Sequence, residues 1–255
     1  MHKHLDKYST TSVILLSAAI AFVATPLIIG LSDLLATVFI VSGLACTILG
    51  SLTVLFSGRE PVDPRLVGLL PVQACLNLCH IASDTGIIGN AHFLPPEITG
   101  ETRVMQFNPE LEYHGGKVSA DRSFTEFAPH GLVTVPTSEP LMQDLRERNG
   151  LAVPDKAEDL AVLINEILTD IFDFAPNVST TYDNASVTVT LQEYRFIDGC
   201  LYANKFKNPQ CCSRYPCAAA SLCGTLVAES TKKVVTLRQC TVSPSNQDVT
   251  IIFSF

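Results

Sequence analysis

Positive charge is scarce in this sequence, and tryptophan is absent. The chain carries 17 lysine and arginine residues against 25 aspartate and glutamate residues, for a net charge of −8. Nucleic-acid-binding domains usually carry a basic face. Nucleic acid is therefore not expected as a partner.

The motifs of several common enzyme classes are also missing. The sequence has no G-x-S-x-G nucleophile elbow, no dinucleotide-binding glycine fingerprint and no H-E-x-x-H metal motif. Gly115-Gly116-Lys117 lacks the rest of a phosphate-binding loop. No residue is thus a candidate for catalysis, and we expect a non-enzymatic protein. An enzyme of unrecognised type stays open as a weaker alternative.

Two stretches near the N-terminus contain no charged residue, Val13–Leu31 and Leu34–Phe56. Each is close to the roughly 20 apolar residues that a helix needs to cross a bilayer. Only a short link containing Asp33 separates them. The pattern predicts a transmembrane helical hairpin over residues 12–56, preceded by a tail over residues 1–11 and followed by a soluble domain over residues 57–255.

The positive charges that flank the hairpin predict its orientation. Lys3 and Lys7 precede the first span, Arg59 and Arg65 follow the second, and the turn carries only an acid. Lysine and arginine favour the cytoplasmic side, so both termini and the soluble domain should be cytoplasmic. A secretory signal ending near Ala24 is the alternative for the first stretch. The second span would then still leave the large domain in the cytoplasm, where the sequons at Asn177 and Asn184 are not used.

Small residues spaced by four follow one face of each predicted span. Such faces let two helix backbones approach closely. Packing within the hairpin is the first interpretation, and homo-oligomerisation through the same faces is the alternative. The residues are Ser17, Ala21, Thr25, Gly43, Thr47 and Ser51.

The soluble domain alternates between helical and strand patterns. An apolar helix over Leu66–Ala82 should pack into the domain rather than lie on the bilayer. Asp155 and Glu158 form a capping-box pattern before a helix with an apolar stripe from Leu160 to Ile171. The second half then predicts a hairpin, another helix and a second hairpin, which indicates an α+β fold with an antiparallel sheet covered by helices on one side. The expected segments are 131–136, 140–149, 178–182, 187–191, 216–231, 234–242 and 248–255.

Nine cysteines are present, and six of them lie between Cys200 and Cys240. Thiolates are good ligands for zinc and iron–sulfur clusters, although the spacing matches no familiar site. A redox-sensing thiol near basic residues such as Arg214 is a second interpretation, and simple burial is a third. If a metal binds, the candidate ligands are Cys211, Cys212, Cys217 and Cys223.

Five segments carry a resemblance to known proteins: Phe93–Gly100, Val104–Phe107, Gly131–Pro136, Cys211–Cys217 and Leu226–Glu229. In these segments the chain resembles a family of uncharacterised archaeal membrane proteins with two N-terminal spans and one soluble domain. This resemblance implies the same architecture. No activity is assigned to that family, so it brings no catalytic residues. The final helix and hairpin are also similar to small-molecule-binding regulatory domains, an analogy of fold alone.

Together these features predict a cytoplasmic domain anchored to the lipid bilayer that binds a protein partner or a small ligand in a regulatory or scaffolding role. No cofactor is expected on this reading. The alternative is a thiol- or metal-based sensor built on the Cys200–Cys240 cluster, with zinc or an iron–sulfur cluster as its metal.

Overall fold

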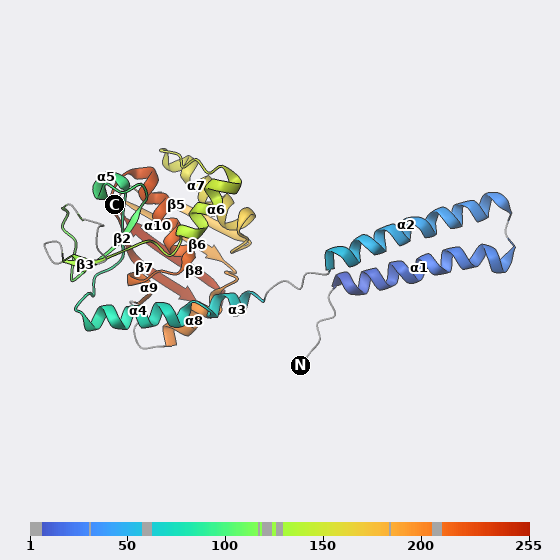
Figure 1. Ribbon diagram of the computed structural model, residues 1–255, viewed down its shortest axis with the longest axis horizontal. Helices are drawn as coiled ribbons and strands as arrows, with labels where there is room; N and C mark the ends of the chain where they lie inside the picture. Colours follow the sequence, from blue (N-terminus) through green and yellow to red (C-terminus); the bar gives the residue numbers. More distant parts are fainter. Residues whose placement is uncertain are drawn as a thin grey trace. The chain divides into compact units, whose positions relative to one another are not determined.

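The computed structural model describes residues 7–30, 32–57, 63–116, 118, 124–125, 130–183, 185–205 and 211–255. The chain divides into two compact units, Met1–Val62 and Asp63–Phe255 (Figure 1). The division falls close to the end of the hairpin predicted from the sequence.

The first unit consists of two antiparallel helices, α1 (Lys7–Ile29) and α2 (Asp33–Ser57) (Figure 1). At about 1.5 Å per residue they are each about 35 Å long or slightly more. Gly43 of α2 lies against α1, where an added Cβ would come within 2.9 Å of Val23 and 3.2 Å of the Ala19 carbonyl oxygen. At this position a small residue serves packing within the hairpin, as expected.

Two helical segments are long and apolar enough to span a membrane, Asp33–Leu55 and Pro64–Asp84. The apolar part of α1, Thr11–Pro26, is shorter. Pro64–Asp84 belongs to the second unit, and four of its residues are buried in a hydrophobic cluster of that unit: Val72, Leu76, Cys79 and Ala82.

The predicted continuous helix over Leu66–Ala82 is wrong in one respect. The segment forms two helices, α3 (Pro64–Leu69) and α4 (Val72–Asp84), separated at Leu70-Pro71. Proline has no N–H and its ring clashes with the preceding turn, which explains the break. The expectation that the segment packs into the domain is confirmed for α4, while Leu70 and Ile81 are 79% and 62% exposed.

The second unit contains a fully antiparallel sheet of eight strands in the order β3-β4-β2-β1-β7-β8-β6-β5. The α+β prediction is confirmed. The strands are β1 (His92–Leu94), β2 (Met105–Pro109), β3 (Phe124–Thr125), β4 (Gly131–Thr134), β5 (Asn177–Asp183), β6 (Ser186–Gln192), β7 (Val235–Ser243) and β8 (Asp248–Ser254).

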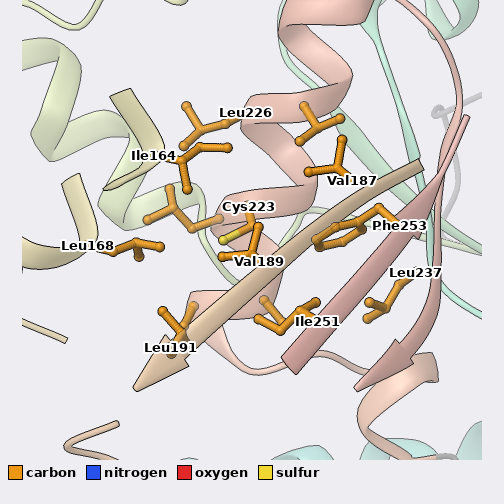
Figure 2. Packing of buried hydrophobic residues seen from close by; sticks show 14 of the residues in the cluster. Ile164, Leu168, Val187, Val189, Leu191, Cys223, Leu226, Leu237, Ile251 and Phe253 are labelled. Atoms are coloured by element: carbon orange, nitrogen blue, oxygen red, sulfur yellow. The ribbon is translucent and has the colours of Figure 1, made fainter. Parts of the chain in front are cut away.

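The largest core lies between this sheet and two helices, α7 (Ala157–Glu166) and α10 (Ala218–Thr231). Alternate residues of β6 and β8 point into it, because successive side chains of a strand face opposite sides. Figure 2 shows Val189 and Ile251 facing Cys223 of α10 and Ile164 of α7. The predicted apolar stripes of both helices are confirmed.

The predicted start of α7 is wrong. Lys156, not Asp155, is the N-cap residue, and no side chain caps this helix. The Asp155 carboxylate instead lies 3.3 Å from the Lys232 ammonium at the end of α10. The predicted capping box is therefore not formed. At its other end, the helix continues beyond Glu166 as a π-helical turn, Ile167–Ile171.

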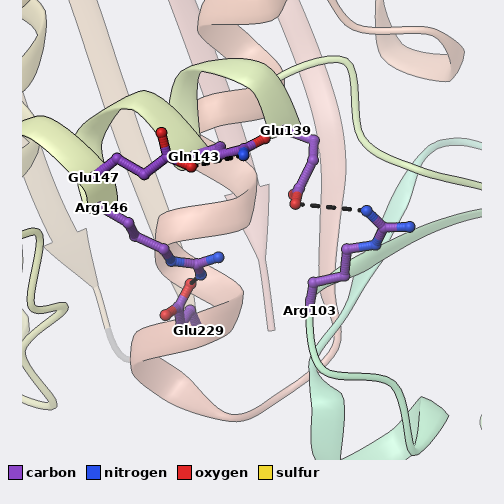
Figure 3. A network of polar contacts seen from close by, with 6 residues as sticks. All are labelled: Arg103, Glu139, Gln143, Arg146, Glu147 and Glu229. Carbon is purple, nitrogen blue, oxygen red and sulfur yellow. Dashed lines mark hydrogen bonds and ion pairs between the residues drawn. The ribbon is translucent and has the colours of Figure 1, made fainter.

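The helix α6 (Glu139–Asn149) is tied to its surroundings by ion pairs (Figure 3). Glu139 pairs with Arg103 at 3.6 Å, and Arg146 pairs with Glu229 of α10 at 2.8 Å. The first pair lies at the N-terminal end of α6, which borders the cavity described next, and the second lies in the last turn of the helix. The remaining helices are α5 (Pro96–Thr99), α8 (Ile197–Lys205) and α9 (Cys211–Arg214).

Candidate functional site

A cavity of about 430 Å³ lies within the second unit. Its wall is formed by α3, α4, α8, α9 and the start of α10, together with residues from the start of α6 and from β7. The lining is mostly apolar, with Val72, Leu76 and Phe196 among its members. Volumes of about 300–1,000 Å³ with apolar walls are typical of small-molecule sites.

The cavity reaches the surface at a rim of exposed or partly exposed residues. Val67 of α3 is 39% exposed, and Thr137, Pro140 and Ala218 are exposed as well. The Thr137 hydroxyl donates a hydrogen bond of 3.1 Å to the Pro216 carbonyl oxygen, which joins two sides of the rim. A ligand therefore has a route from the surface to the buried wall.

Two glycines bring two walls of the cavity together. Gly68 of α3 and Gly199 of α8 both line it. The backbone of Gly199 lies so close to the Gly68 carbonyl oxygen that a Cβ on Gly199 would overlap with it. The absence of a side chain at this position is what lets α8 approach α3 and carry Cys200 into the wall.

Six cysteines line the cavity, and all nine cysteines of the chain are free thiols. They come from five different segments: α4, α8, α9, the residue before α10, and β7. Only the tertiary structure brings them together. They are Cys75, Cys200, Cys211, Cys212, Cys217 and Cys240.

Cys217 and Cys200 form one thiol pair. The contact between the two side chains is the largest cause of a lowered pKa for Cys217, about 6, and of a raised pKa for Cys200. Burial opposes the shift of Cys217, while the backbone N–H groups of Ala220 and Ala219 and the side chain of Tyr194 favour its thiolate. Cys217 is the N-cap residue of α10, a position where the helix dipole stabilises a negative charge.

Cys79 and Cys211 form a second thiol pair. A side-chain hydrogen bond with Cys211 is the largest cause that lowers the pKa of Cys79 to about 7, against the opposing effect of burial. The nearby side chains of Arg214 and His80 contribute in the same direction. The same hydrogen bond raises the pKa of Cys211.

The other cavity thiols are held in the neutral form. Burial is the largest cause that raises the pKa of Cys75, of Cys240 and of Cys212, the last to about 12. The cavity therefore combines neutral, weakly polar sulfur with one thiolate site at Cys217.

The four predicted metal ligands do not all lie on this cavity. Cys211, Cys212 and Cys217 line it, whereas Cys223 is fully buried in the core between α10 and the sheet (Figure 2). Within the described parts of the chain, no group of three or more histidine, cysteine, aspartate or glutamate side chains is arranged to hold a metal ion. The zinc or iron–sulfur centre thus stays a prediction from sequence.

The basic residues around the cysteine run are mostly engaged elsewhere. Arg195 pairs with Asp173 at 2.6 Å, and Lys232 pairs with Asp155. Arg214 does act on a thiol, because its charge near Cys79 lowers the pKa of that thiol. Lys207 lies outside the described residues.

Sequence reasoning missed three residues of the site. Cys75 and Cys79 stand far from the cysteine run, and Tyr194 is one aromatic residue among many. A helical spacing of four between Cys75 and Cys79 was a usable signal, since it places both on one side of α4. No pattern in the sequence around Tyr194 distinguished it from the other aromatic residues.

Comparison of the chain with known protein families, with curated proteins and with solved structures gave no match. The site is therefore interpreted from its own geometry and chemistry.

Proposed function

We propose that this protein is a membrane-anchored cytoplasmic domain that binds a small apolar ligand in the cysteine-lined cavity. The apolar cavity of about 430 Å³ carries this proposal. Burial of apolar surface stabilises a bound ligand by about 25 cal/mol per Å². The few polar groups at the wall, such as Tyr194 and the thiolate of Cys217, would orient it.

The surface around the mouth favours a ligand that partitions into lipid. Val67 borders the mouth, and Leu66 and Leu70 of the same segment are 59% and 79% exposed. This segment begins at Pro64, shortly after the apolar helix α2 ends at Ser57. An apolar ligand would meet these exposed apolar side chains at the mouth before it reaches the cavity. A protein partner on the same surface is the alternative.

The proposal depends on anchoring by the N-terminal hairpin. α2 has the length and composition of a span, and the flanking lysines and arginines favour a cytoplasmic location for both termini. The small-residue faces leave homo-oligomerisation open.

Native mass spectrometry of the full chain, released from lipid nanodiscs, tests ligand binding. We expect the wild-type protein to retain a non-covalent apolar molecule. Replacement of Ala203→Phe should reduce retention, because Ala203 lines the cavity and a phenyl ring there would occupy part of the space for the ligand. Ala152→Phe is the matched control, since Ala152 is exposed on a loop away from the lining residues. Equal retention by wild type and Ala203→Phe would refute the proposal.

A further inference from the structure

The pair Cys217 and Cys200 has the arrangement of a nucleophilic thiol beside a second thiol that can resolve it. Cys217 is partly exposed, whereas Cys200 is 7% exposed. Both line the same cavity, and the interaction between their side chains is the largest cause of the pKa shift of each thiol. Oxidation of either sulfur would place it next to a partner able to form a disulfide.

Three kinds of group lower the pKa of the Cys217 thiol. The Cys200 thiol comes from α8, the Tyr194 hydroxyl from the segment before α8, and the backbone N–H groups of Ala219 and Ala220 from the first turn of α10. Tyr194 is buried, and burial raises its pKa well above 10, so its hydroxyl keeps its proton and can donate it in a hydrogen bond. Such donors stabilise a thiolate, the nucleophilic form of cysteine.

The apolar lining of the cavity favours an organic hydroperoxide over hydrogen peroxide as the oxidant. Hydrogen peroxide is small and strongly hydrated, and it gains little from an apolar cavity. An organic hydroperoxide has an apolar group that the cavity can bury and a terminal O–O bond that the sulfur can attack. Lipid peroxidation yields such molecules in the phase where we expect this protein to be anchored.

We propose that Cys217 and Cys200 form a redox-active dithiol that reduces an organic hydroperoxide held in the cavity. The proposal rests on the proposed function, because it names the class of apolar ligand that the cavity takes.

The reaction balances without a cofactor. The Cys217 thiolate attacks the terminal oxygen of the hydroperoxide, the O–O bond breaks, and the alkoxide leaves and takes up a proton as the alcohol. Cys217 becomes a sulfenic acid. The Cys200 sulfur then attacks the Cys217 sulfur, the S–S bond forms, the S–O bond breaks, and hydroxide leaves with the Cys200 proton as water. Two thiols are oxidised by two electrons in total, and the hydroperoxide is reduced by two.

Return to the dithiol requires a separate thiol reductant, by thiol–disulfide exchange. A disulfide that forms and is reduced in this way is the usual kind in a cytoplasmic protein. A single turnover is sufficient to test the proposal.

The test uses the reduced full chain in lipid nanodiscs with cumene hydroperoxide or hydrogen peroxide as the oxidant. We expect one equivalent of cumyl alcohol per chain and a Cys200–Cys217 disulfide detected by peptide mass spectrometry without reductant. Cumene hydroperoxide should react at least about tenfold faster than hydrogen peroxide, because burial of its apolar group favours its encounter with Cys217.

Three variants assign the roles. Cys217→Ser should abolish the reaction. Cys200→Ser should stop it at the sulfenic acid, which dimedone will trap on Cys217. Cys46→Ser is the control, since Cys46 is a free thiol on α2 that is not among the cavity-lining residues and should react like the wild type.

Absence of the Cys200–Cys217 disulfide, or equal rates with the two oxidants, would overturn this proposal. If the protein retains an apolar molecule in native mass spectrometry but does not consume cumene hydroperoxide, the dithiol proposal fails and the ligand-binding proposal stands. If neither retention nor reaction is found, both fail.

Discussion

Gly199 on α8 lies directly against the carbonyl oxygen of Gly68 on α3, with no room for a side chain between them. This contact holds two walls of the cavity together and places Cys200 within reach of Cys217. We expect Gly199→Ala to lower the free energy of unfolding by about 1–3 kcal/mol, the usual cost of overpacking, and to weaken retention of the apolar ligand. Urea unfolding of the full chain in mild detergent, followed by tyrosine fluorescence, measures the first effect.

The control for Gly199→Ala is Asn204→Ala on the same helix, at an exposed position. Its unfolding free energy should stay within about 0.5 kcal/mol of the wild type. A Gly199→Ala protein as stable as this control would contradict the close contact.

The lowered pKa of Cys217 predicts a pH profile for alkylation. The thiolate is the reactive form, so modification of Cys217 by iodoacetamide should rise to half of its maximum near pH 6 and stay high above it. Cys212, with a pKa raised to about 12, should react only at high pH. Mass spectrometry of the alkylated peptides gives both profiles from one sample. A half-maximum near pH 9 for Cys217 would show that its neighbours do not stabilise the thiolate.

Substitution of Cys223 distinguishes a structural role of this residue from a role as a metal ligand. Because it is fully buried in the core, Cys223→Ser should lower the unfolding free energy by about 1–3 kcal/mol by burying a hydroxyl group. The loss should be the same with a chelator and with added zinc. Stoichiometric zinc or iron in the wild type that is lost from Cys223→Ser would instead support the predicted metal centre. Elemental analysis of the anaerobically purified protein decides between the two.

The exposed apolar side of α3 predicts contact with lipid. The chain has no tryptophan, so Leu70→Trp introduces a single tryptophan, which can be excited apart from the tyrosines, at a position that is 79% exposed. We expect brominated lipids to quench its fluorescence in nanodiscs. Val162→Trp, at a 66% exposed position on α7, is the control and should not be quenched. Equal emission from Leu70→Trp in brominated and ordinary lipid would contradict contact of this surface with the bilayer.

The orientation of the hairpin predicts protection of the C-terminus in intact cells. An epitope tag placed after Phe255 should resist external protease until the cells are lysed, because both termini are expected in the cytoplasm. Glycosylation at Asn177 in a secretory-pathway host would place the second unit on the opposite side. Asn177 begins β5 and is exposed, so it would be accessible for modification there.

Much of the fold was predictable from local patterns. The alternation in Val187–Leu191 required a strand with one buried face, and β6 has that pattern. The apolar stripe of α10 required burial, and Leu222, Cys223 and Leu226 are all 0% exposed. The break at Pro71 was also readable, since proline in a helical pattern ends or kinks the helix. The capping box predicted at Asp155 did not form, and this shows the limit of prediction from local patterns. The ion-pair partner of Asp155, Lys232, is distant in sequence.

The amino-acid sequence by itself determined the uncharged N-terminal stretches, the strands β4 to β8 and the helices α6, α7 and α10, since these depend on the order of neighbouring residues. Only the tertiary structure decided which thiols meet. It placed Cys200 beside Cys217 and Cys79 beside Cys211, and it moved Cys223 into the core. Which thiols pair depends on how the helices α3, α4, α8 and α10 pack against one another. The spacing of cysteines within one segment does not predict such pairs.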